Sequence, residues 1–365
     1  MIPAQVQSGG PGAVGETRTP TSPPQADPAP WFEIFRGSFG TELFVAAVAH
    51  FGLFDRLATG PRSFGSLSEE LGLAPRALNV LLTAVRAMGA VARDPDGSFR
   101  LTESAREHLL RTSPHFMGDY CALAAGSPGV LEMVERLRTN RPKGSDEGGS
   151  GVGFIYRDGL KSAMDSESMA RHFTLSLAGR ARNVAPALAE RLPMAGAQRL
   201  LDVGGGTGIY SVALLRRNPG LRAVVFDRPE VLRVAAEFAA GSGVADRLEL
   251  RPGDFFTDPF PAGADAILLS NILHDWDVPE CQVLLRRCAE ALPSGGRLIL
   301  QDVFLDDDLG GPLPIALYSA ALFSVTEGRA YSASEYSGWL REVGLHPIER
   351  IPTLAHCAAL VAVKR

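Results

Sequence analysis

The chain has 365 residues, of which 45% are hydrophobic and 21% are charged, and its formal net charge is −5. This composition is typical of a globular protein of about two domains, and it excludes a fibrous or wholly disordered chain. A net negative charge gives no electrostatic reason to bind nucleic acid, because phosphate binding requires clustered Lys and Arg.

Residues 1–30 contain 4 Gly and 7 Pro without apolar periodicity, which predicts a disordered leader. They also lack the charged and apolar regions of a secretory signal. The longest uncharged run, Leu309–Thr326, is interrupted by Gly and Pro and is too short to cross a bilayer, so we expect no membrane partner. Four cysteines without a CxxC pair favour reduced thiols in a cytoplasmic protein.

The first folded region is predicted over residues 31–140. Apolar positions spaced by three and four residues predict one helix from Trp31 to about Leu57. Ser66 and Glu69 then form a candidate capping box at the start of a helix that ends near Gly72. A second helix over Pro75–Met88 and two short strands joined at Asp96-Gly97 complete the pattern of a winged-helix unit.

A winged helix has two possible uses. The Pro75–Met88 helix could enter a DNA major groove, or the same shape could serve packing and dimerisation. Residues 61–100 hold five Arg and four acidic residues, a net charge of only about +1. We favour the packing function, because proteins that bind in a groove are usually clearly basic.

Residues 141–190 are predicted to form a linker, RPKGSDEGGSG, followed by a helix over 166–191. Residues 191–365 then alternate short apolar strands with helices, which predicts an α/β fold with a mainly parallel, Rossmann-like sheet. The last two strands, in HPIERIPTL and HCAALVAVKR, have no helix between them and must pair as a hairpin. One strand of the sheet is therefore expected to be antiparallel.

A glycine-rich loop, Gly204-Gly205-Gly206-Thr207-Gly208, directly follows the strand RLLDV and precedes a helix. Glycine at this position lets backbone amides approach a ligand beyond the carboxyl ends of the strands. Asp202 lies just before the loop, where its charge would repel a phosphate and attract an ammonium group. The sequence therefore predicts a cofactor with an amino-acid head.

Two further carboxylates follow the next two strands. Asp227 ends the second strand, where it can accept both hydroxyls of a ribose. The third strand leads into Gly253-Asp254-Phe255, which offers an acceptor for an adenine amino group and an aromatic wall beside the ring. Three carboxylates at successive strand ends, without Lys or Arg in the glycine loop, predict S-adenosylmethionine rather than NAD or ATP.

Four segments carry a family resemblance: LDVGGGTG, VVFDRPEV, PGDFF and SNILHDWDVPECQVLLRRCAEALPSGGRLILQD. They resemble the class I S-adenosylmethionine-dependent O-methyltransferases of the caffeic acid, acetylserotonin and bacterial polyketide-tailoring type. The resemblance covers nearly all of residues 31–365, and it implies a homodimer whose winged helix is the dimerisation module. It also implies that Arg228 and Ser270 join the cofactor site, with Ser270 near the methionine end.

His274, in the LHDW motif, is the candidate general base. A histidine titrates near neutrality and can take a proton from a phenol. The family places two carboxylates around this histidine; the first matches Asp302, but the second falls on Ala330, with Glu327 three residues earlier. Either Glu327 takes that role or His274 works with Asp302 alone, while Asp275 orients the ring or caps the next helix.

The acceptor pocket is expected from the helix segments Phe173–Arg180 and Ile315–Val325 and from residues 116–123. The candidate lining residues are apolar and suit a flat aromatic acceptor: Met117, Phe173, Leu177, Tyr318, Leu322 and Phe323. The leading hypothesis is methylation of a phenolic hydroxyl of a natural-product intermediate. Two alternatives stay open, namely C-methylation beside a carbonyl, with His274 binding a metal or an enolate, and a DNA-binding regulator.

Overall fold

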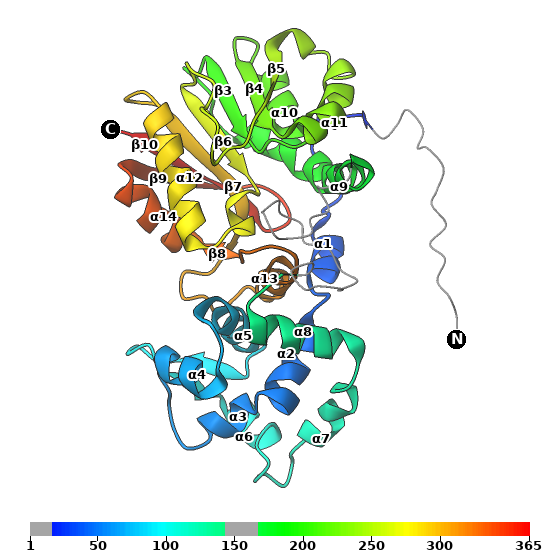
Figure 1. Ribbon diagram of the computed structural model, residues 1–365, viewed down its shortest axis with the longest axis vertical. Coiled ribbons are helices and arrows are strands. Elements are labelled where there is room, and N and C mark those ends of the chain that lie inside the picture. The colour runs from blue at the N-terminus through cyan, green and yellow to red at the C-terminus, as the bar shows by residue number, and fades with distance from the viewer. Residues whose placement is uncertain (1–16, 143–166) are drawn as a thin grey trace, which may run out of the picture.

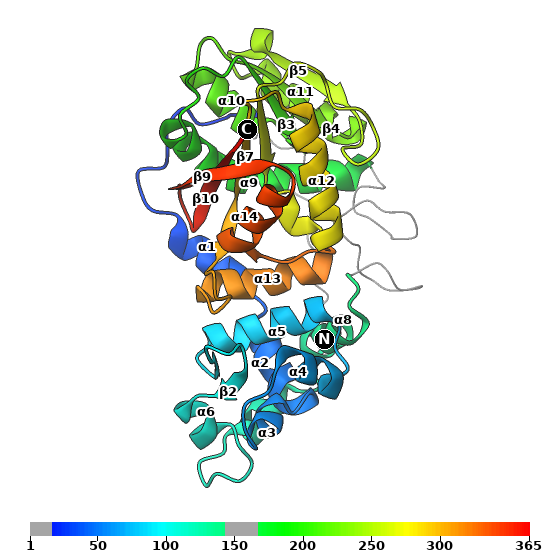
Figure 2. The same ribbon diagram turned by 90° about the vertical axis from the view of Figure 1, so that its left-hand side faces the viewer.

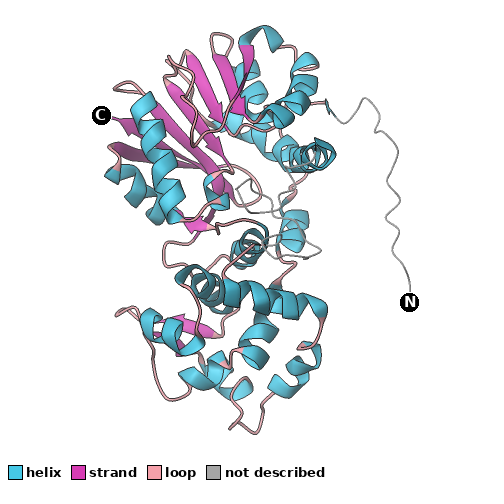
Figure 3. Ribbon diagram, in the orientation of Figure 1, coloured by secondary structure: helices cyan, strands magenta, loops and turns pink. Residues whose placement is uncertain are grey.

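The computed structural model describes residues 17–142 and 167–365, and two packing regions are visible in it (Figures 1 and 3). The region drawn below is mostly helical, and the region drawn above is a sheet covered by helices. Helix α13 (Leu313–Val325) lies between them, as the turned view in Figure 2 also shows.

The first apolar stretch is not one helix, as the sequence predicts, but a series of short ones. They are α1 (Ala29–Arg36), α2 (Gly40–Val45), the π-helical turn η2 (Ala46–His50) and α3 (Leu53–Leu57). The chain breaks after Arg36 and again at Gly52, whose φ of 55° lies in the left-handed region. These breaks let α1 pack on α13 while α2 and α3 build the N-terminal core.

The predicted winged-helix elements are present as α4 (Phe64–Leu71), α5 (Pro75–Ala87), β1 (Val91–Arg93) and β2 (Phe99–Leu101). The predicted capping box is wrong. Helix α4 begins a turn earlier, with the Ser63 hydroxyl accepting from the Ser66 N–H at 3.1 Å, and the Ser66 hydroxyl donates to Glu70 within the helix. Helices α6 (Glu103–His108), α7 (Gly118–Cys121), η3 (Ala122–Ala124) and α8 (Pro128–Thr139) complete this region.

Helix α5 occupies the position of a recognition helix, yet it packs on α13 and most of its residues are buried. The buried Arg76 of α5 donates to the carbonyl oxygens of Thr326 and Gly328, both at 3.2 Å, and its guanidinium lies 4.5 Å from the centre of the Phe323 ring. A helix that is mostly buried against α13 has little surface left for a DNA groove, which disfavours the DNA-binding alternative.

The large sheet has the order β5-β4-β3-β6-β7-β10-β9. Strand β10 (Cys357–Lys364) runs antiparallel to both of its neighbours, and the other pairs on this path are parallel. This confirms the predicted sheet and its terminal hairpin. The short strand β8 (Tyr331–Ser332) also pairs with β7. The remaining strands are β3 (Arg199–Val203), β4 (Arg222–Asp227), β5 (Leu248–Pro252), β6 (Ala266–Ser270), β7 (Arg297–Leu305) and β9 (Leu345–Pro352).

Helices cover both faces of the sheet. One face packs against α9 (Glu167–Arg191), α10 (Ile209–Arg217) and α11 (Pro229–Ala240), and the other against α12 (Val278–Ala291) and α14 (Ala333–Glu342). The short helices η5 (Ala245–Arg247) and η6 (Leu273–Asp275) lie in the connections. The carboxyl ends of β3, β4, β5 and β6 meet at one edge, which places the residues after them close together.

Part of the predicted leader, residues 1–30, packs against the rest of the protein. Residues 1–16 lie outside the described residues, but Thr19 is buried, and its carbonyl oxygen accepts from Arg216 of α10 at 2.8 Å. Backbone carbonyls of this segment thus satisfy arginine donors of the sheet region. The predicted linker falls largely within 143–166, which is also outside the described residues, and within the described ones no helix is both long and apolar enough to cross a membrane.

Candidate active site

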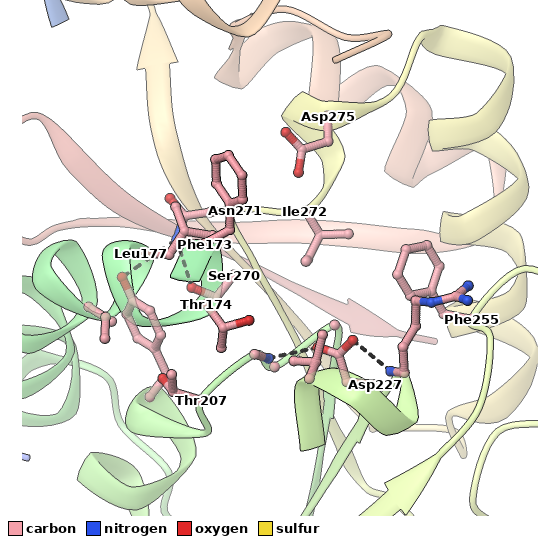
Figure 4. A pocket seen from close by; sticks show the side chains of 18 of the residues that line it. Phe173, Thr174, Leu177, Thr207, Asp227, Phe255, Ser270, Asn271, Ile272 and Asp275 are labelled. Carbon is pink, nitrogen blue, oxygen red and sulfur yellow. Dashed lines mark hydrogen bonds between the residues drawn. The ribbon is translucent and has the colours of Figure 1, made fainter. Parts of the chain in front are cut away.

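An open-mouthed cavity lies where the carboxyl ends of the parallel strands face α9. Its empty space, which includes open solvent at the mouth, is about 1200 Å³. In Figure 4, Asp227 and Asp275 lie at opposite ends of the labelled residues, with Ile272 and Phe173 between them. The residues around Asp227 and those around Asp275 therefore line different parts of one cavity.

The glycine loop and Asp227 form one end of the cavity. Asp227 accepts hydrogen bonds from the backbone N–H groups of Gly206 at 2.8 Å and Arg228 at 2.7 Å. Gly206 has a φ of 58°, a conformation that side chains disfavour, and it brings its amide to the carboxylate. Burial raises the pKa of Asp227 to about 6, and these hydrogen bonds oppose the rise.

Asp202 lies beneath the loop and is not among the residues that line the cavity. Its side chain is fully buried, accepts from the Ser211 hydroxyl at 2.6 Å and keeps one oxygen without a hydrogen-bond partner. Burial raises its pKa to about 7. The structure therefore does not place Asp202 against an ammonium group; a Cβ on Gly205 would lie 2.6 Å from this carboxylate, so Asp202 supports the loop from below.

Most other predicted cofactor residues do line the cavity, namely Gly204, Gly205, Gly206, Arg228, Asp254, Phe255 and Ser270. Gly253 is the exception, because a Cβ at this position would lie 2.4 Å from the Phe226 ring, so its role is close packing. Asp254 is held in place by accepting from the Phe256 N–H at 2.7 Å. The rings of Phe255 and Phe256 pack edge-on against Trp276, which makes an aromatic wall at this end.

His274 and Asp302 form a buried pair. His274 Nδ1 lies 2.6 Å from Asp302 Oδ1, which also accepts from the Val303 N–H at 2.8 Å. Because a carboxylate oxygen accepts, we assign the Nδ1 proton to His274, which leaves Nε2 as the basic nitrogen. The His274 side chain is 4% exposed and lies behind the cavity lining, with its ring edge-on to Tyr318.

Asp275 reaches the cavity and stands beside the basic nitrogen of His274. Its Oδ1 lies 3.6 Å from His274 Nε2. Burial raises the pKa of Asp275 to about 6, opposed by the charges of His274 and Arg180. The next helix is capped by Asp277, which accepts from the Val278 N–H at 2.9 Å, so Asp275 is not its cap. Asp302 and Asp275 therefore flank the two nitrogens of the ring.

Glu327 contributes to this segment through its backbone, whose N–H donates to the Asp275 carbonyl at 3.1 Å. Burial lowers the pKa of the Arg76 guanidinium, and the nearby negative charge of Glu327 partly offsets this effect. Ala330, at the position of the family's second carboxylate, is fully buried. The carboxylate that lies beside His274 Nε2 is that of Asp275, the next residue in the sequence.

The predicted acceptor-lining residues divide into two groups. Phe173 and Leu177 line the cavity, and Tyr318 contacts the His274 ring from behind the lining. Leu322 and Phe323 belong instead to the buried cores on opposite sides of α13, and Met117 lies in the N-terminal region and is 41% exposed. The structure does not bring these three residues to the cavity.

Several lining residues were not predicted, above all Arg180, Tyr210 and Asn271. Asn271 follows β6 with a φ of 57°, donates to the Ser270 hydroxyl at 3.0 Å and keeps a buried Oδ1 without a partner. Its place directly after a parallel strand is a signal that sequence reasoning could have used. Among the described residues, no group of His, Cys, Asp and Glu side chains is arranged to hold a metal ion.

Comparison with known proteins gives one family match. The family model described as an O-methyltransferase domain matches residues 149–346. The chain is 33% identical, over 91% of its length and 93% of the relative's, to a 3-hydroxy-5-methyl-1-naphthoate 3-O-methyltransferase of Streptomyces sahachiroi.

Two solved structures are also similar. An O-methyltransferase family 2 protein from Planctomyces limnophilus, in complex with apigenin, is 47% identical with a TM-score of 0.86, covering 95% of this chain and 99% of that one. Human N-acetylserotonin methyltransferase, in complex with S-adenosylmethionine, has a TM-score of 0.59 at 23% identity, covering 93% and 99% of the two chains, and shows the same fold.

Proposed function

The chain belongs to the O-methyltransferase family, and from this premise we propose that it methylates a phenolic hydroxyl of an aromatic natural-product intermediate, with His274 as the general base. The chain is an S-adenosylmethionine-dependent O-methyltransferase. The observation that carries the proposed base is the His274–Asp302 pair at 2.6 Å, next in sequence to Asp275, which lines the cavity. The aromatic acceptor is supported by the relatives, which are named for a naphthoate substrate and for bound apigenin.

The residues at the glycine-loop end fit the cofactor. The Asp227 oxygens are held by two backbone N–H groups and keep lone pairs for a pair of ribose hydroxyls. Asp254 and Phe255 would hold the adenine ring, and Asn271, with its unpartnered Oδ1, would accept from the ammonium group that Asp202 does not reach. When bound, S-adenosylmethionine supplies an electrophilic methyl group on its sulfonium sulfur.

The residues at the opposite end perform the proton chemistry. Asp302 fixes the ring and the Nδ1 proton, so that Nε2 takes the proton of the acceptor hydroxyl. The imidazolium that forms is then flanked by Asp302 and Asp275, whose negative charges stabilise it. The apolar side chains of Phe173 and Leu177 line the same cavity and would hold a flat ring within it.

We further propose that the protein is a cytoplasmic homodimer. In each chain, a dimerisation region would extend to about residue 140 and a catalytic region would follow residue 190. The outer face of α1 supports the dimer: Trp31, Ile34 and Phe35 are 75%, 72% and 76% exposed. The inner face docks on the same chain, because Arg36 stacks near Phe32 and donates to the Ala355 carbonyl. Three large apolar side chains on one helix face favour a protein partner.

The experiment that tests the proposed function is incubation with methyl-labelled S-adenosylmethionine and a panel of phenols, flavones and hydroxynaphthoates. We expect the label on a phenolic oxygen, located by NMR of the product. A label on a ring carbon would contradict the proposal and support the C-methylation alternative. Failure to methylate any phenol, with cofactor binding intact, would also contradict it.

A further inference from the structure

Arg180 places a positive charge in the cavity that neither the family motifs nor the proton chemistry uses. It projects from α9, lines the cavity and is half-buried. Its Nη1 donates to the Tyr318 hydroxyl at 3.1 Å, and its Nε is buried without a hydrogen-bond partner. Among residues 17–142 and 167–365, no carboxylate forms an ion pair with it within 4 Å.

The negative charges nearest to Arg180 already have other partners. Asp302 accepts from His274 and from the Val303 N–H, and Asp275 lies beside His274 Nε2. Both act on Arg180 only through space. A half-buried guanidinium with an unpartnered Nε and no carboxylate in an ion pair with it can still bind an anion, so this corner of the cavity suits a negatively charged ligand group.

The corner is also held rigid. Tyr318 accepts from Arg180, its ring lies edge-on to His274, and the guanidinium of Arg36 lies 5.4 Å from the ring centre. Tyr318 is thus fixed from α1, from α9 and from the catalytic histidine at once. A fixed guanidinium recognises a planar carboxylate through two parallel N–H···O bonds, which Lys cannot reproduce.

We infer that Arg180 binds the carboxylate of a ligand in this cavity, and that this carboxylate belongs to the aromatic acceptor. The inference deepens the proposed function and rests on it. Arg180 donates to Tyr318 and interacts electrostatically with Asp275, which lies beside His274. This position favours a carboxylate of the acceptor over that of the cofactor. The methionine carboxylate of the cofactor has the same chemistry and is the second source. The substrate class is then a hydroxylated aromatic acid rather than a neutral phenol.

The test compares two matched pairs by calorimetry. The first pair is a hydroxynaphthoate and the naphthol without its carboxylate, measured with saturating S-adenosylhomocysteine; the second is S-adenosylmethionine and its decarboxylated form. The variants are Arg180→Met and Arg180→Lys. Arg217→Met is the control, because Arg217 is exposed on α10, away from the cavity lining.

We expect Arg180→Met to weaken the hydroxynaphthoate about tenfold or more while the naphthol is unchanged, with partial recovery in Arg180→Lys. If Arg180→Met instead weakens S-adenosylmethionine but not its decarboxylated form, Arg180 binds the methionine carboxylate of the cofactor rather than the carboxylate of the acceptor. Equal losses for both members of each pair, or no loss, would overturn the inference. These measurements are of binding, so failure to methylate a phenol would reject the proposed function separately.

Discussion

At the scale of single residues, the proposed proton transfer depends on the two carboxylates around His274. Asp302 lies 2.6 Å from Nδ1 and Asp275 lies 3.6 Å from Nε2. The family pattern expects a second carboxylate at the position of Ala330, which is fully buried here. In this structure the two carboxylates that flank the ring are Asp302 and the neighbouring Asp275.

Asp275 should control the acid side of the pH profile. Because burial raises its pKa to about 6, wild-type kcat/KM should fall as the pH drops through about 6 and the flanking charge is lost. In Asp275→Asn the side chain carries no charge at any pH. The variant's kcat/KM should therefore be lower than that of the wild type at neutral pH, and it should not show the fall near pH 6. The measurement is kcat/KM between pH 5 and 9.

Asp277→Asn is the matched control for this prediction. Asp277 caps α12 two residues further on, so the variant should lose stability by about 1 kcal/mol at most and keep the wild-type pH profile. An Asp275→Asn profile that matched that of the wild type would show that the Asp275 charge does not act on the reaction.

At the scale of elements, the strand-end residues could be predicted from the sequence more completely than the residues on helices, of which Phe173 and Leu177 were predicted and Arg180 was not. Asp227, Asp254, Ser270 and His274 follow strands of a parallel sheet, whose carboxyl ends must meet at one edge. Arg180 lies on a long helix, and sequence alone cannot tell an arginine that faces a cavity from one that faces solvent. Its role depends on Tyr318, which is 138 residues away.

Helix α13 shows why periodicity fails for a buried helix. Leu322 packs in the sheet core, while Phe323 packs in the N-terminal core, so the helix is apolar all round and no face marks a pocket. The capping box fails for a related reason. The Ser-x-x-Glu pattern occurs at Ser66 and at Ser332, but only at Ser332 does the chain enter the helix at that serine.

The turn after α13 holds the catalytic loop by close contact at Gly328. A Cβ on Gly328 would lie 2.1 Å from the His274 carbonyl oxygen and 2.6 Å from the Trp276 nitrogen. Gly328→Ala should therefore displace the His274 loop and lower kcat about 100-fold, as misplacement of reacting groups by about 1 Å does. Cofactor affinity should change little. Turnover and calorimetry measure the two effects.

Gly338→Ala is the control for close packing. Gly338 lies in α14 with no atom within 4 Å of an added Cβ, so alanine should stabilise the protein by about 0.5–1 kcal/mol and leave kcat unchanged. Full activity in Gly328→Ala would mean that the His274 loop does not depend on this contact.

At the scale of the whole molecule, the buried carboxylates of the cavity make the stability of the ligand-free protein depend on pH. Burial raises the pKa of Asp227 to about 6, so between about pH 4 and 6 the folded state binds more protons than the unfolded state. Stability must then fall as the pH rises through this window. Asp202 and Asp275, whose pKa values burial also raises, act in the same direction.

Asp227→Asn should remove its share of this dependence. Relative to the wild type, the variant should gain up to about 3 kcal/mol between pH 4 and 8, since each pKa unit corresponds to about 1.4 kcal/mol. The measurement is the free energy of unfolding in denaturant at several pH values, without cofactor. A constant difference between the two proteins across this range would contradict the raised pKa.

The assembly offers a second test at this scale. Phe35→Glu places a charge on the apolar outer face of α1 and should convert a dimer to a monomer, as measured by light scattering with size-exclusion chromatography. Val283→Glu, which alters an exposed apolar residue on α12, should remain dimeric. A dimeric Phe35→Glu variant would show that the outer face of α1 is not the interface.

His274 is proposed to take the proton from the acceptor, and the single-turnover rate of His274→Gln, measured beside its affinity for the cofactor, tests this role. Glutamine keeps much of the side-chain volume but cannot accept a proton at neutral pH. We predict unchanged affinity for S-adenosylmethionine and a rate lower by about 10²–10⁴-fold, the usual contribution of general base catalysis. A His274→Gln rate equal to that of the wild type would contradict the account, since transfer would then need no base at this position.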